Sequence, residues 1–73
     1  MLNIKVKDNV SKNDLPLIKL FRQIVNLGMF YDIESFYNGI TSGDFKHHKI
    51  YKNKNTIEVK RRSDNELIFV VIE

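Results

Sequence analysis

The sequence predicts a small α+β domain in which two helices pack on one face of a small, mainly antiparallel sheet. Three observations favour this class: residues 2–6 alternate between apolar and polar, two segments in the middle have a helical apolar pattern, and the segments after them resemble strands. The expected order is β-α-α-β-β, with a further short strand near residue 50, and residues 1–73 form a single domain. The chain has no cysteine, so its stability must come from apolar packing rather than disulfides.

A helix over Asn13–Gly28 is the best-defined element of the sequence. Asn13 or Asp14 is suited to cap its start, Pro16 fits the first turn, and Gly28 is suited to end it. The apolar residues that follow a helical repeat are Leu17, Ile18, Phe21, Ile24 and Val25. This element is therefore expected to organise both the sheet and the second helix.

Two shorter elements flank this helix. Residues 2–6 alternate apolar and polar side chains, which is typical of a half-buried strand. Phe30–Asn38 predicts a second, shorter helix that ends at Gly39, after a tight corner of about two residues. We expect this second helix to form only by packing on its neighbours, because it is too short to be stable alone.

The C-terminal part of the chain has the composition of strands and turns. Thr41–Asp44 is expected to be a loop, and Lys49–Tyr51 a short strand. Thr56–Arg61 alternates apolar and charged residues, whereas Leu67–Ile72 is almost wholly apolar and rich in β-branched residues. The last strand is therefore expected at the centre of the sheet, paired with the first.

Positive charge is concentrated in residues 46–62, the basic hairpin, where Glu58 is the only acid. Its cations are Lys46, Lys49, Lys52, Lys54, Lys60, Arg61 and Arg62. Such cations could hold phosphates while the ring of Tyr51 stacks on a base, which predicts nucleic-acid binding as an alternative function. A solvated hairpin that only keeps the protein soluble is the simpler interpretation.

The sequence contains no catalytic motif, so we expect a non-enzymatic protein without cofactor or metal. His47 and His48 are adjacent, and neighbouring side chains on a strand point to opposite faces, which makes them a poor chelating pair. A small ribonuclease-like toxin is a further alternative, because the order of elements is broadly similar to that of ribosome-dependent ribonuclease toxins. Its residues would be His48, Tyr51, Lys52, Arg61 and Arg62.

Residues 2–29 resemble the first half of the C-terminal domain of the bacterial ribosomal stalk protein. That domain has an alternating strand, a helix with an Ile-Lys pair and an Arg three residues later, and a Leu-Gly-Leu corner. The matching residues here are Leu2, Ile4 and Val6, then Ile18, Lys19 and Arg22, then Leu27, Gly28 and Met29. The stalk family continues with a third helix, whereas this sequence continues with the basic hairpin.

The resemblance implies a protein-docking helix, because the stalk domain recruits translational GTPases through its first helix and the following corner. The contact residues that it implies are Ile18, Lys19, Arg22 and Met29. We therefore expect a small intracellular, cytoplasmic adaptor that binds another protein. We expect neither a signal peptide nor a membrane-spanning segment, since the sequence shows no suitable apolar run. The apolar last strand could also join two copies of the chain, so a homodimer is a further alternative.

Overall fold

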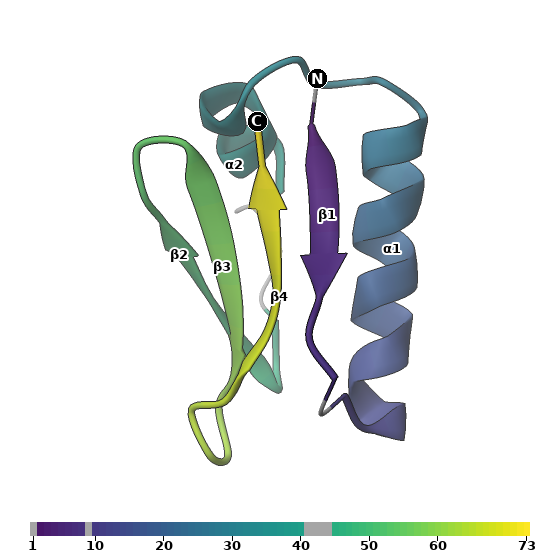
Figure 1. Ribbon diagram of the computed structural model, residues 1–73, viewed down its shortest axis with the longest axis vertical. Coiled ribbons are helices and arrows are strands. Elements are labelled where there is room, and N and C mark those ends of the chain that lie inside the picture. Colours follow the sequence, from purple (N-terminus) through teal and green to yellow (C-terminus); the bar gives the residue numbers. More distant parts are fainter. Residues whose placement is uncertain (1, 9, 41–44) are drawn as a thin grey trace.

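The computed structural model describes residues 2–8, 10–40 and 45–73. Within them the chain forms two helices and a four-stranded antiparallel sheet, which confirms the α+β class (Figure 1). The elements are β1 (Asn3–Val6), a 3₁₀ turn η1 (Lys12–Asp14), α1 (Leu15–Asn26), α2 (Ile33–Ile40), β2 (His48–Lys52), β3 (Thr56–Arg61) and β4 (Leu67–Ile72). The short strand expected near residue 50 is β2, and the loop predicted over residues 41–44 lies outside the described residues.

The sheet has the strand order β1-β4-β3-β2, and each neighbouring pair is antiparallel. The apolar strand β4 is an inner strand, as its composition predicts. It pairs with β1, with Ile4 opposite Val71, so the predicted pairing of the first and last strands is confirmed. The first strand is at the edge of the sheet rather than at its centre, because β3 takes the other side of β4.

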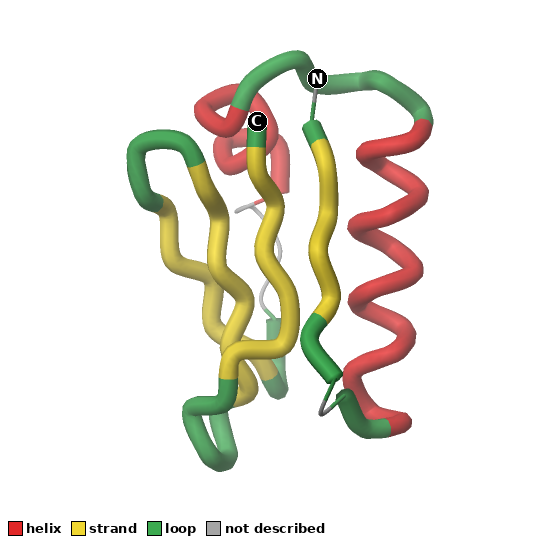
Figure 2. Tube along the Cα trace, in the orientation of Figure 1, coloured by secondary structure: helices red, strands yellow, loops and turns green. Residues whose placement is uncertain are grey.

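Side chains of both helices join one core against the same face of the sheet, since Phe21 of α1 meets both Phe36 of α2 and Phe69 of β4. In Figure 2, α2 lies behind the sheet and α1 lies beside β1. Phe21 is fully buried at the centre of this core, where its ring lies 5.0 Å from that of Phe69 and 5.6 Å from that of Phe36. The opposite face of the sheet is covered by neither helix. The domain is therefore two-layered, with one open sheet face.

The ends of the helices agree with the sequence at the first helix and differ at the second. Gly28 has a φ of 67° directly after α1, as expected of the residue that ends a helix. The second helix, in contrast, starts at Ile33, because the Asp32 carboxylate accepts the Ser35 N–H at 2.8 Å. Residues 27–32 therefore form a longer connection than the predicted tight corner.

Gly39 lies inside α2 rather than after it, so the predicted stop at this residue is wrong. The reason for a glycine here is packing: a Cβ at this position would overlap with the ring of Phe30. Phe30 belongs to the connection between the helices and packs edge-on against Phe36 of α2, with ring centroids 5.6 Å apart. The absent side chain thus allows the connection to close onto the second helix.

Candidate functional site

A groove of about 530 Å³ lies between the edge strand β1 and the C-terminal end of α1. Its lining includes Leu2 directly before β1, Ile4 from β1, Val25 and Asn26 from α1, and Phe30 and Tyr31 from the connection. Most of these side chains are apolar, and none of the six carries a charge. A cavity of this size and chemistry suits an apolar side chain of a ligand.

Large exposed apolar residues surround the C-terminal end of α1. The exposed fractions are 65% for Leu27, 62% for Met29 and 85% for Tyr31. Clustered apolar exposure of this kind marks interaction surfaces in folded proteins. Met29, predicted as a contact residue, is thus placed on an accessible surface.

Ile18 is the exception among the predicted docking residues, because it is only 4% exposed and belongs to the core. It faces the sheet, since Phe21, one turn later on the same side of α1, is also buried. Ile18 therefore cannot contact a partner directly. Lys19 and Arg22, in contrast, are exposed.

The edge of β1 offers main-chain hydrogen-bonding groups to the groove. The Lys7 N–H donates to the Ile68 carbonyl of the β4 segment at 2.8 Å. Main-chain groups alternate in direction along a strand, so those of Ile4 and Val6 point away from β4, toward the edge. Such an edge can accept an added strand from another chain.

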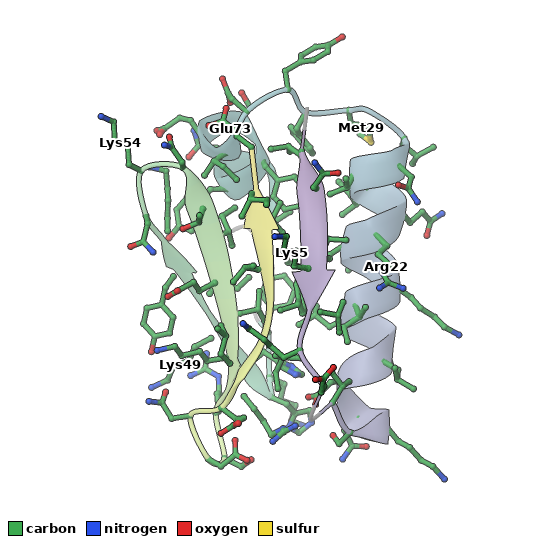
Figure 3. The ribbon with its side chains drawn as sticks, viewed as in Figure 1. Lys5, Arg22, Met29, Lys49, Lys54 and Glu73 are labelled. Carbon is green, nitrogen blue, oxygen red and sulfur yellow. The ribbon has the colours of Figure 1, made fainter. Side chains whose placement is uncertain are left out.

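The two elements that form the groove carry positive charges only, although none of these charged residues lines the groove itself. Lys19 and Arg22 are the only charged residues of α1, and Lys5 is the only one of β1. Figure 3 shows Arg22 projecting from α1 and Lys5 lying in front of β1. Because no acid lies on either element, the flanks attract negatively charged groups.

No protein-family model, curated protein or solved structure matches this chain. Among the described residues, neither helix is long and apolar enough to cross a membrane. After α2 the described chain continues with three strands and no third helix, so the resemblance to the stalk domain concerns residues 2–29 alone. It stays a prediction, and the groove supports a docking role independently of it.

The cations of the basic hairpin do not gather on one surface. Lys49 and Lys60 lie opposite each other on the open face of the sheet, beside Tyr51. Lys52 points to the helical side, where its Nζ lies 2.9 Å from a carboxylate oxygen of Glu34. Lys46 and Lys54 lie outside the strands, in the connections before and after β2.

The two arginines of the hairpin are held by other parts of the chain. The Arg62 Nε donates to the Phe45 carbonyl at 3.2 Å. The Arg61 guanidinium donates from Nη2 to Asp14 at 2.7 Å and from Nη1 to Asp64 at 2.6 Å. The predicted nucleic-acid residues therefore divide into an open-face group, a group with structural contacts, and Lys46 and Lys54 in the connections around β2.

Asp14 is the centre of a buried polar cluster that the sequence does not reveal. Only 1% of it is exposed, and its Oδ1 lies 2.7 Å from Nε2 of His48, itself 5% exposed. Its Oδ2 accepts from Arg61 and from both the N–H and the hydroxyl of Ser11. The cluster ties the start of α1 to β2 and β3.

Asp14 is the N-cap residue of α1, as the sequence predicts, but its side chain makes no capping hydrogen bond to that helix. It bonds back to Ser11 instead, in a capping box around the preceding 3₁₀ turn. The spacing Ser-x-x-Asp is the one sequence signal that indicates this arrangement. Nothing in the local sequence indicates His48 or Arg61 as partners.

Burial alone would raise the pKa of Asp14, but hydrogen bonds from Arg61, Ser11 and His48 outweigh it and hold the pKa well below its usual range. Asp14 is therefore ionised near neutral pH and acts only as an acceptor, so the proton of the hydrogen bond belongs to His48 Nε2. The hydrogen bond between Arg61 and Asp14 also raises the pKa of Arg61 above its ordinary value.

The cluster predicts a loss of stability in acid. A carboxyl whose pKa is lower in the folded than in the unfolded chain stabilises the fold above its unfolded pKa, about 3.9 for Asp. We expect the free energy of unfolding to fall as the pH drops below about 4. Urea unfolding between pH 7 and pH 2.5 would measure this loss of stability. Asp8 is exposed, so the control variant Asp8→Asn should lose stability in acid as the unchanged protein does. A pH profile that Asp14→Asn leaves unchanged would contradict the assignment.

The residues considered for a ribonuclease do not converge. His48 and Arg61 meet through Asp14, but Tyr51 lies on the opposite face of the sheet, because neighbouring strand residues alternate. Lys52 is paired with Glu34 and Arg62 with the main chain of Phe45. The fold therefore does not bring these five side chains together at one place.

Proposed function

We propose that this chain is a non-enzymatic docking domain that binds an extended segment of a partner protein in the groove between β1 and α1. The observation that carries the proposal is the coincidence of three features at one place. The groove is apolar, its rim exposes Leu27, Met29 and Tyr31, and the main-chain groups of Ile4 and Val6 face the same edge. Together they provide what strand addition needs.

The flanking charges indicate the chemistry of the partner segment. A strand added beside β1 would place alternate side chains in the groove and on the open side of the sheet. The groove accepts apolar side chains, whereas the open side presents Lys5. The partner segment is therefore one in which apolar residues alternate with acidic ones, and Lys19 and Arg22 contribute further attraction.

A second copy of the chain is a poorer occupant of this edge. If two β1 strands paired antiparallel, Lys5 of one copy would lie near the lysines of the other on the same face of the joined sheet. Lysines on edge strands commonly prevent such self-pairing. The proposal therefore names a different protein, and self-association is an outcome that the test can detect.

Charge reversal on α1 tests the proposal. The probe is a fluorescein-labelled synthetic peptide in which valine alternates with glutamate, titrated with the protein and followed by anisotropy. We expect Lys19→Glu combined with Arg22→Glu to weaken binding at least tenfold, because attraction becomes repulsion along the helix that borders the groove. Met29→Ser combined with Tyr31→Ser should also weaken peptide binding, since the apolar rim of the groove is lost.

Lys46→Glu combined with Lys54→Glu is the matched control, because it changes the net charge equally at positions away from the groove. The control should bind within about twofold of the unchanged protein, and a peptide with lysine in place of glutamate should not bind. Equal losses in the two double variants would refute a specific groove. Sedimentation at the same protein concentrations would detect a dimer. A dimer would show that a second copy of the chain, and not a different protein, occupies this edge.

A further inference from the structure

The open face of the sheet brings together lysines from three strands and an aromatic ring. Lys5 comes from β1, Lys49 and Tyr51 from β2, and Lys60 from β3. In Figure 3, Lys5 lies in front of the strands and Lys49 projects to the left of β2 and β3, both away from the helices. The residues between them on this face include Thr56, Glu58, Val70 and Ile72, of which only Glu58 carries a charge.

Two of these lysines are in an unfavourable position for the isolated fold. Lys49 and Lys60 are direct cross-strand partners in the β2–β3 pair, and like charges placed opposite each other destabilise a sheet. The Lys60 ammonium lies 5.2 Å from the ring centroid of Tyr51, which offsets part of this repulsion by a cation–π contact. An anion bound between the two lysines would relieve the rest.

Tyr51 provides the second half of a binding site. It is 39% exposed, and its cross-strand partner is Glu58, which pairs in turn with Val70 opposite Lys5. A ring on an open sheet face can stack on a base, while lysines around it hold the phosphates. The row from Tyr51 to Lys5 crosses all four strands, about 14 Å at the usual strand spacing.

We infer that this open face binds single-stranded nucleic acid, with Tyr51 stacking on a base and Lys5, Lys49 and Lys60 contacting phosphates. Double-stranded DNA fits this face less well. Its major groove is only about 12 Å wide, so the broader face of a four-stranded sheet cannot enter it. The site differs from the basic hairpin expected from the sequence, since it includes Lys5 and excludes Lys52 and Arg61. The two sites share only Lys5. Substitutions at Lys49, Lys60 and Tyr51 leave the groove unchanged, so either proposal can fail without the other.

The test is the anisotropy of fluorescein-labelled oligouridylate and oligothymidylate, titrated with the protein at several salt concentrations. Three phosphate contacts predict a slope of about −2 for the logarithm of the binding constant against that of salt. Lys49→Thr combined with Lys60→Thr should reduce affinity at least tenfold and flatten the slope to about −0.7, because one contact remains. Tyr51→Ala should reduce affinity about five- to 150-fold with the slope unchanged.

Lys46→Thr combined with Lys54→Thr removes the same charge outside the strands and should cost little affinity. A loss as large in this control as in the sheet variant would overturn the proposal, as would Tyr51→Ala with unchanged binding or a preference for duplex. A separate thermal melt without ligand should show that Lys49→Thr raises Tm by about 1–6 °C, because the cross-strand repulsion is removed. A lower Tm would contradict this account of the lysine pair.

Discussion

Asp14→Ala is expected to destabilise the fold by about 3–5 kcal/mol, the usual effect of breaking a buried ion pair. The substitution removes the acceptor shared by His48 and Arg61 and leaves polar atoms of the cluster buried without it. A chain of 73 residues has a total stability of only about 4–11 kcal/mol. The variant should therefore lose at least about 12 °C in Tm or fail to fold at 37 °C.

Asp64→Ala is the matched control for this prediction, because Asp64 also binds Arg61 but its side chain is 51% exposed. Exposed pairs contribute at most about 1 kcal/mol, so this variant should stay close to the unchanged protein. The loss of stability for Asp14→Asn should lie between those for Asp14→Ala and Asp64→Ala, since the amide keeps one oxygen acceptor but no charge. If urea unfolding placed Asp14→Ala within about 1 kcal/mol of the unchanged protein, the cluster would not be a main source of stability.

Phe21→Ala is expected to cost a similar amount, about 3–5 kcal/mol, by opening a cavity in the centre of the core. The side chain is fully buried, and its ring contacts those of Phe36, Phe45 and Phe69 from both layers. Its removal would detach α1 from the sheet and from α2 at once. Circular dichroism during urea unfolding would measure the loss of stability.

Leu20→Ala provides the comparison on the same helix, because Leu20 is 45% exposed and lies one position away. It should change the free energy of unfolding by less than about 1 kcal/mol. Phe21→Leu should recover most of the stability, since it refills much of the volume with an apolar side chain. Equal effects of Phe21→Ala and Leu20→Ala would show that the core is not centred on α1.

The sequence predicts the regular elements well where the local pattern is strong. Thr56–Arg61 and Leu67–Ile72 match β3 and β4 at both ends, because alternation and β-branched composition are local signals. The error at the second helix has a tertiary cause. Gly39 resembles a helix stop in sequence, but its role is to make room for the ring of Phe30, which only the folded chain brings there.

The surfaces are less predictable, since they depend on which residues the fold brings together. A charge count places Lys52, Arg61 and Arg62 in one basic hairpin, yet each is engaged with a different part of the chain. Lys5 lies far away in sequence and joins the open face only because β1 pairs with β4. The groove similarly needs both the edge position of β1 and the long connection after α1, neither of which has a local signal.

Amide hydrogen exchange with the valine–glutamate peptide bound tests the docking proposal most directly. Strand addition at β1 requires that the N–H groups of Ile4 and Val6 donate to the peptide, because they point to the edge of the sheet. We expect the exchange of these two amides to slow at least tenfold on binding, while that of Lys49 and Lys60 is unaffected. Saturating peptide that leaves the Ile4 and Val6 amides unprotected would contradict the account.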